Sequence, residues 1–301
     1  MRRFVRRKGL GYGVAWAGTG LGGAATPFVL DWLLKSYGHR VALRAWAVVQ
    51  VGRIDTHRTN PETNLLTETL QLLGIGSAIL LVKNRLPTTG QPTLRRVDAA
   101  FLKRAPFWIF QLPNIMTALG TYLPVLYIPT FAASIGLPAF SGPLALALYS
   151  VSTFGGCLLL GGLVDHFHVC TVILLSTLGQ LIAIFVFWGL TNGQALLYIF
   201  AIVYGIFGGA FVATWPGASL AIRRAIPGCY VDTGFVLSLF TMGKGLGSVV
   251  SGPISTALLQ SGWHVNAKLA YGSEFGGMIV FTGVSAALGV IAAFGRVFRI
   301  V

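Results

Sequence analysis

Residues 169–217 read VCTVILLSTLGQLIAIFVFWGL (169–190), TNGQ (191–194) and ALLYIFAIVYGIFGGAFVATWPG (195–217), and they contain no charged side chain. Each apolar block reaches the roughly 20 residues that an α-helix needs to cross the hydrocarbon core of a bilayer. The uncharged link between the blocks suits a turn at a membrane surface. Because hydrocarbon offers no hydrogen bonds to the backbone, this pair predicts two membrane-spanning helices.

The same pattern continues through the chain. Of 301 residues, 54% are hydrophobic and only 10% are charged, and the mean hydropathy is +0.75. A soluble domain carries roughly 25% charged residues, so lipid is the expected solvent for the outer face. The sequence predicts an all-α membrane protein of about eight spans. Besides an interrupted second span, these cover residues 10–33, 106–131, 143–164, 169–190, 195–217, 233–259 and 275–297.

The second predicted span is interrupted by a polar insert. Residues 42–50 and 72–82 are apolar but too short to cross, and residues 51–71 between them read VGRIDTHRTNPETNLLTETLQ. Without the insert, the flanks join into one span of about 20 residues. Two interpretations stay open, a polar loop between half-helices or a translated intron. The intron hypothesis fits Val51, whose codons begin with GT, and Gln71, which CAG can encode.

The basic residues predict the orientation. The chain has 22 Lys and Arg against 8 Asp and Glu, a net charge of +14. With the N-terminus in the cytoplasm, residues 2–8, 83–104, 223–224 and 296–299 hold most of the cations on the inner side. The positive-inside rule then places both termini in the cytoplasm. Because the cations lie in loops between spans, no nucleic-acid partner is expected. The plasma membrane is the expected location, with a vacuolar or other organelle membrane as the alternative.

The opening stretch, residues 4–18, reads FVRRKGLGYGVAWAG. It resembles F-x-K-R-R-x-L-A-x-G-x-A-x-A-G, the signature at the fifth helix of monocarboxylate-transporter-like proteins of the major facilitator superfamily. Residues 161–168, GGLVDHFH, resemble a weakened copy of that superfamily's G-x-x-x-D-R-x-G-R loop. The resemblance implies an incomplete transporter fold, helices five to twelve of twelve. It implies a remnant of the N-terminal half at 1–82, a basic cytoplasmic linker at 83–105 and a C-terminal six-helix half at 106–301.

Few residues of the predicted spans could bind a substrate. Lys244 lies inside the seventh span, where an unpaired charge is costly and usually faces a cavity. It could anchor an anionic substrate or extend toward the membrane surface, and Arg44 has a weaker case. On the third span Gln111, Asn114 and Tyr122 line a substrate path or form interhelical hydrogen bonds.

Other residues are expected to have structural roles. Gly161 and Asp165 belong to the cytoplasmic loop motif, where Asp165 caps the following helix or pairs with Arg223 or Arg224. Small residues four apart allow close helix contact. The glycines predicted to act in this way are Gly18, Gly22, Gly205, Gly209, Gly243 and Gly247.

The resemblance implies alternating-access transport of small organic acids, such as a monocarboxylate moving with a proton. Two alternatives are export of a specialised metabolite by the same fold and a non-transporting fragment or pseudogene product. No paired carboxylates or nucleophile triad are present, so an enzyme is not expected. Neither a metal nor a cofactor is expected, and the sequence predicts no oligomeric state.

Overall fold

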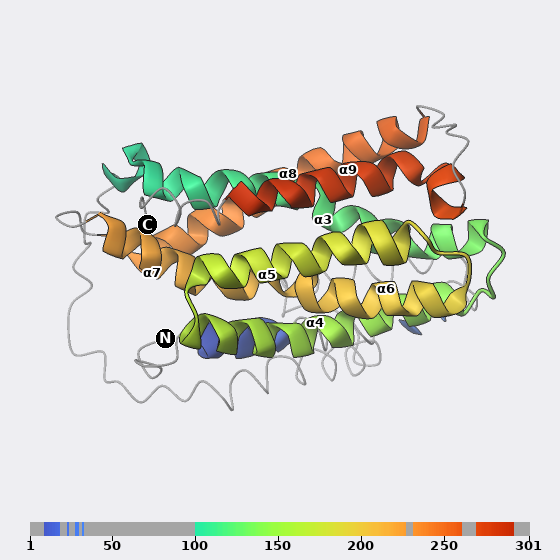
Figure 1. The fold of residues 1–301 in the computed structure, drawn as a ribbon, viewed down its shortest axis with the longest axis horizontal. Coiled ribbons are helices and arrows are strands. Elements are labelled where there is room, and N and C mark those ends of the chain that lie inside the picture. Colours follow the sequence, from blue (N-terminus) through green and yellow to red (C-terminus); the bar gives the residue numbers. More distant parts are fainter. Residues whose placement is uncertain are drawn as a thin grey trace, which may run out of the picture. The chain divides into compact units, whose positions relative to one another are not determined.

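The computed structural model describes residues 9–18, 23, 28–29, 32, 100–226, 231–260 and 269–291. The chain divides into two compact units, residues 1–24 with 97–301, and residues 25–96. The helices below belong to the first unit (Figure 1). The domain boundaries expected at 82 and 105 stay a prediction. The insert at 51–71 and Arg44 lie outside the described residues.

Every described element is a helix. Residues 9–18 are helical, followed by η1 (Ala100–Lys103), α3 (Ala105–Ser134), α4 (Ser141–His166) and α5 (Val169–Ile182). A π-helical segment, η2 (Ala183–Trp188), extends α5. Next come α6 (Gln194–Phe207), the 3₁₀ segment η3 (Gly209–Thr214), α7 (Trp215–Ala225) and α8 (Thr233–Gln260). The chain then forms η4 (Leu269–Gly272), α9 (Gly276–Ala287) and η5 (Leu288–Val290).

The third to seventh predicted spans are confirmed as helices long and apolar enough to cross a membrane. Their bounds are Ala105–Ser134, Ser141–His166, Val169–Trp188, Gln194–Ala225 and Thr233–Gln260. The sixth runs beyond its predicted end at 217, because η3 and α7 continue it as far as Ala225. The eighth appears as the shorter helix Gly276–Val290, close to where the described residues end.

Local sequence explains where these helices begin and end. Pro106 and Pro216 lie in the first turns of α3 and α7, where a missing N–H costs little. After α3, Gly136 adopts a φ of 74°, a left-handed value that glycine reaches without strain. Its N–H donates to Ala133 O at 3.0 Å and closes the helix end.

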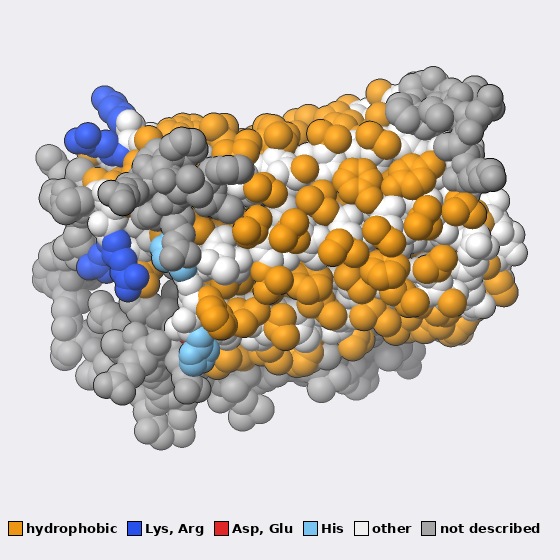
Figure 2. Space-filling model, viewed as in Figure 1, with side chains coloured by type: hydrophobic (Ala, Val, Ile, Leu, Met, Phe, Trp, Pro, Cys, Tyr) orange, Lys and Arg blue, Asp and Glu red, His pale blue; other side chains and the backbone are white. Residues whose placement is uncertain are grey.

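Two sets of helix–helix contacts position the residues of the candidate site. α3 packs closely against α8 and α9, and α4 packs against α6 and η3. Hydrophobic side chains cover the flanks of the helices, while Lys and Arg side chains gather at one end (Figure 2). That distribution is the one expected for a body surrounded by hydrocarbon and charged at its water-facing rim.

The π-helical segment is held by Tyr271. The Tyr271 hydroxyl donates to Phe185 O at 2.6 Å. A π turn leaves a carbonyl without its usual helical partner, and this bond supplies one. Desolvation by burial raises the pKa of Tyr271, so its hydroxyl keeps its proton and stays a donor.

Candidate functional site

The candidate site is centred on Lys244, near the middle of α8. Among the described spans it is the only Lys, Arg, Asp or Glu that lies away from a helix end. Its Nζ lies 5.9 Å from the ring centroid of Trp16, 5.3 Å from that of Tyr122 and 6.0 Å from that of Trp215. The described carboxylates all lie at or beyond a helix end: Asp165, Asp232 and Glu274. Among the described residues, the Lys244 ammonium is therefore accompanied by three aromatic rings instead of a carboxylate counter-ion.

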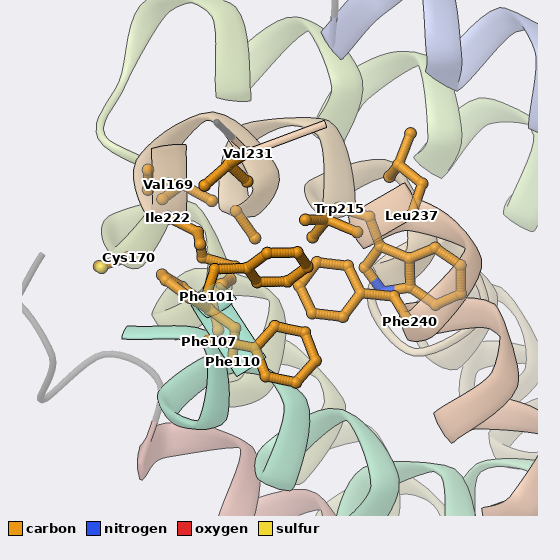
Figure 3. Close-up of a cluster of buried hydrophobic side chains, with 14 of the residues drawn as sticks. Phe101, Phe107, Phe110, Val169, Cys170, Trp215, Ile222, Val231, Leu237 and Phe240 are labelled. Atoms are coloured by element: carbon orange, nitrogen blue, oxygen red, sulfur yellow. The ribbon is translucent and has the colours of Figure 1, made fainter. Parts of the chain in front are cut away.

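The two tryptophans also contact each other. Trp16 comes from the 9–18 helix and Trp215 from the first position of α7, with ring centroids 6.1 Å apart and planes at 77°. Trp215 also packs against Phe240 of α8 at 6.0 Å (Figure 3). The 3₁₀ segment η3 ends immediately before Trp215, and such a break within a long helix often marks a functional position.

Gln111 and Asn114 fasten α3 to α8. The Nε2 of Gln111 donates to Leu239 O at 3.0 Å, and the Nδ2 of Asn114 donates to Phe240 O at 2.9 Å. Both side chains are buried. Of the two roles considered above, these are interhelical hydrogen bonds, one turn before Lys244. The Oε1 of Gln111 is buried and has no partner among the described residues. Substrate contact by either amide stays a prediction.

Tyr122 has a different environment from these amides. It is 43% exposed, and its ring is the nearest of the three to the ammonium. A small cavity beside Trp215 is lined mainly by apolar side chains, with Asn114 and Thr214 as its polar residues. The indole nitrogen of Trp215 is buried and has no acceptor among the described residues. The site therefore combines one cation, aromatic walls and an unused N–H donor, a set that suits an anion with an apolar body.

Four of the six predicted packing glycines make close contacts. A Cβ at Gly205 would lie 2.5 Å from Tyr149 O, and one at Gly247 would lie 2.6 Å from the Ala118 Cβ. An added Cβ would come still closer to a neighbour at the other two positions, to Thr153 Oγ1 at Gly209 and to Gln111 Nε2 at Gly243. Gly243 and Gly247 thus allow α8 to approach α3 and present Lys244.

Gly18 does not make the predicted contact. A Cβ at Gly18 would meet no atom of the described residues within 4 Å, and Gly22 lies outside them. The close approach of this helix occurs instead five and nine residues earlier. At Gly9 and Gly13 an added Cβ would collide with the backbone of α4, at Gly161 and Cys157 respectively.

Gly161 and Asp165 lie within α4, not in the predicted loop, which is a correction. The carboxylate oxygens of Asp165 accept hydrogen bonds from the N–H groups of Gly9 and Leu10, at 2.8 Å each. Asp165 thus caps the 9–18 helix rather than the helix that follows it. The following helix, α5, is capped by His168, whose Nδ1 accepts from the Cys170 N–H at 3.3 Å.

The expected pairing of Asp165 with Arg223 or Arg224 is not found, although all three residues are described. The physical reason is that the N-terminal N–H groups of a helix provide two directed donors and a positive dipole end. The 9–18 helix is thus fixed to α4 by a cap and a glycine contact. This attachment places Trp16 over Lys244.

Sequence reasoning missed Trp16 and the partners of Asp165. The available signals were the glycines at 9 and 13, spaced four apart as in a helix contact, and the tryptophan one turn further on. The partner helix of these residues lies about 150 positions away in the chain. Local spacing shows that a contact exists but not with which helix.

No family model matches the chain. It is 27% identical over 302 residues to the MFS-type transporter hasB of Aspergillus fumigatus, across 98% of this chain and 62% of that protein. It is 27% identical over 307 residues to the aspyridones efflux protein apdF of Emericella nidulans, across 97% of this chain and 52% of that protein. Human monocarboxylate transporter 11 is 26% identical over 259 residues, across 83% of this chain and 51% of that protein.

The chain is a homologue of major facilitator superfamily transporters. It spans about half to three-fifths of the length of these curated relatives. The described residues form helices without strands, and five of these helices could cross a membrane, which is consistent with an incomplete all-α membrane fold of that superfamily. These relatives are transporters, which are not enzymes.

Proposed function

We propose that this chain binds and carries a small organic anion, with Lys244 as the anion-binding residue. The observation that supports the proposal most is an ammonium within a predicted span that lies near three aromatic rings and, among the described residues, near no carboxylate. An incoming carboxylate can replace weak ring contacts by a charge-assisted hydrogen bond, which is roughly twice as strong as a neutral one. The aromatic faces then contact the apolar part of the substrate.

A direct test uses binding to the purified chain in detergent. Trp16 and Trp215 border Lys244, so benzoate binding is expected to change the tryptophan fluorescence. Lys244→Gln is expected to raise the Kd for benzoate by about tenfold or more, since hydrogen bonds to charged groups contribute about 1.5–3 kcal/mol. Lys244→Arg keeps the charge and should bind within a few-fold of the wild type.

The matched control is Arg223→Gln, which removes an exposed cation from the end of α7. It should leave the Kd for benzoate unchanged. Equal affinity in Lys244→Gln and the wild type would remove Lys244 as the anchor. Transport is measured separately, as uptake of labelled benzoate into proteoliposomes compared with protein-free liposomes. If binding is intact and uptake is absent, transport by this chain is refuted while the anion site stands.

Proton coupling belongs to the same proposal and would involve Asp165. This is the one Asp or Glu within the described spans, at the end of α4. Its oxygens accept two N–H groups of the 9–18 helix, so protonation would weaken that cap. Benzoate uptake that rises with an inward proton gradient, and loses this dependence in Asp165→Asn, is the expected result. Gradient dependence that persists in the variant would exclude Asp165 as the carrier.

Export of a specialised metabolite is the second candidate. It is favoured by the Emericella relative, whose name describes it as an efflux protein for aspyridones. The aromatic surroundings of Lys244 suit a larger apolar anion as well as a small one. Fluorescence titration with 1-naphthoate and acetate discriminates between them. Tighter binding of 1-naphthoate supports the larger class, and tighter binding of acetate supports the short-chain acids.

A further inference from the structure

A second group of cations lies at one end of the helices, separate from Lys244. Lys103 and Arg104 stand where α3 begins, and Arg223 and Arg224 lie in the last turn of α7. All four are exposed, and the Lys and Arg side chains gather at this end of the molecule (Figure 2). We refer to these four residues as the cationic rim.

One hydrophobic cluster holds both parts of the rim in place. Phe101 and Phe107, on either side of Lys103 and Arg104, are buried with Ile222 and Ile226 from the end of α7 (Figure 3). Phe101 also packs edge-on against Phe107, with ring centroids 5.5 Å apart. The two cation pairs therefore flank a packed platform rather than separate loops.

Two described carboxylates near this end already accept hydrogen bonds. Asp165 accepts the N–H groups of Gly9 and Leu10, and Asp232 Oδ1 accepts the Gly234 N–H at 2.8 Å at the start of α8. Among the described residues, the four cations of the rim make no ion pair with either carboxylate. Among the described residues, the rim therefore carries more positive than negative charge, at the end that the positive-inside rule assigns to the cytoplasm.

An apolar stripe continues from the rim along α3. Trp108 and Leu112 follow Arg104 at intervals of four residues, so the three share one face of the helix. Trp108 is 43% exposed and Leu112 is 50% exposed. The indole nitrogen of Trp108 donates to Leu102 O at 2.7 Å, which orients the ring at the level of the cations. Tryptophan is enriched at this depth of a membrane.

We propose that the cationic rim binds the headgroup of an anionic phospholipid, whose acyl chain lies along Trp108 and Leu112. A phosphodiester at Arg104 places its glycerol beside Trp108, and hydrocarbon begins at Leu112. A soluble anion would use the four cations but not the stripe. Basic residues at the cytoplasmic ends of membrane helices often bind the headgroups of acidic lipids. The anionic lipid serves here as a boundary ligand, distinct from any transported anion at Lys244.

The test measures binding of fluorescent phosphatidylserine and fluorescent phosphatidylcholine to the full chain in detergent micelles. The wild type is expected to prefer phosphatidylserine by more than tenfold. Each cation near a charged lipid surface contributes about fivefold. One double variant neutralises the first pair, Lys103→Gln with Arg104→Gln, and another neutralises the second, Arg223→Gln with Arg224→Gln. Each should lower the preference for phosphatidylserine by about 25-fold, and should abolish it if the wild-type preference is below 25-fold.

Three controls keep the outcome decisive. The exchange Lys103→Arg with Arg104→Lys retains the charge and should retain the preference, and Lys244→Gln removes a cation elsewhere and should also retain it. In the wild type, raising salt from 0.05 to 0.5 M should reduce the preference, because charges at an exposed rim are screened. This last measurement needs no variant and holds even if a neutralised variant fails to fold.

Equal binding of the two lipids by the wild type would overturn the proposal, and so would a preference that survives neutralisation of both pairs. Displacement of phosphatidylserine by a few millimolar inorganic phosphate would assign the rim to a free anion instead of a lipid. Leu112→Gln interrupts the stripe and leaves every charge in place. It should weaken phosphatidylserine and phosphatidylcholine alike, and an unchanged affinity for both would remove the acyl-chain part of the proposal.

Discussion

Replacing Asp165 by Asn tests how the 9–18 helix is attached to α4. The carboxylate accepts two N–H groups at 2.8 Å, one on each oxygen. Asn has a single carbonyl oxygen and no charge, so it can keep at most one of these bonds and loses the interaction with the helix dipole. Loss of a cap costs about 0.5–2 kcal/mol, and loss of the dipole interaction about 0.3–1 kcal/mol. We expect a total near 2 kcal/mol for local release of the helix.

Cys157 reports that release. It is 1% exposed and belongs to a cluster with Ala17 and Leu160, beneath the 9–18 helix. A thiol in this position reacts with a maleimide only when the covering helix opens. An opening that is easier by about 2 kcal/mol should raise the labelling rate about 30-fold. The assay uses a background in which the other two cysteines, Cys170 and Cys229, are replaced by alanine.

Asp232→Asn is the matched control. Asp232 also caps a helix through a 2.8 Å bond to a backbone N–H, but it does so at α8. Its replacement should leave the labelling of Cys157 unchanged. If Asp165→Asn labels within twofold of the wild type while Asp232→Asn behaves as expected, the cap does not hold the helix. The glycine contact would then be sufficient.

Three further substitutions test packing and polar contacts. Gly161→Ala places a Cβ 2.7 Å from Gly9 O and should lower the melting temperature, since overpacking costs about 1–3 kcal/mol. Its control is Gly155→Ala on the same helix, where the new Cβ meets nothing within 4 Å and the melting temperature should stay unchanged. Asn114→Leu removes the donor to α8 and is expected to cost about 0.5–1.5 kcal/mol in urea unfolding, so a loss below measurement would show that the bond is dispensable. Tyr271→Phe removes the hydroxyl that bonds the π-helical segment and should speed amide hydrogen exchange within η2, whereas unchanged exchange would show that the segment needs no support.

Long apolar blocks were the most predictable part of this fold. Hydrocarbon requires that each segment satisfy its own backbone, so a run such as 106–131 specifies a helix with little dependence on its neighbours. The predicted end at 217 was too early, because the pattern of Gly and Pro at 208–217 resembles a helix terminus. In the structure the backbone tightens to a 3₁₀ segment there and continues as α7. Lipid or packed protein around the segment makes a continued helix less costly than an open turn.

The site was only half predictable. An isolated lysine such as Lys244 is conspicuous in an apolar sequence, because a buried charge requires a compensating environment. The side chains around this lysine could not be predicted from the spacing of residues in the sequence. They are Trp16, Tyr122 and Trp215, which come from three different elements far apart in the chain. The amides of Gln111 and Asn114 illustrate the reverse case. Their position on one helix face was evident, but whether they meet a ligand or a neighbouring helix depends on how closely α8 approaches.

The residues that Asp165 caps and Trp16 of the site lie on the same helical segment, residues 9–18, so the stability of the cap and the contacts of the site depend on each other. Gly9 and Trp16 are seven residues apart, or about 10 Å along the helix axis. Release of the cap lets Trp16 leave the ammonium, and one cation–π contact is worth about 0.5–2 kcal/mol. Linkage is reciprocal, so an anion that draws the Lys244 ammonium away from the Trp16 ring must loosen the helix by the same free energy. We therefore expect benzoate to speed the labelling of Cys157 by a factor of about 2–30 in the wild type. The same benzoate concentration should have no effect in Lys244→Gln, and an equal acceleration in both proteins would show that the anion acts elsewhere.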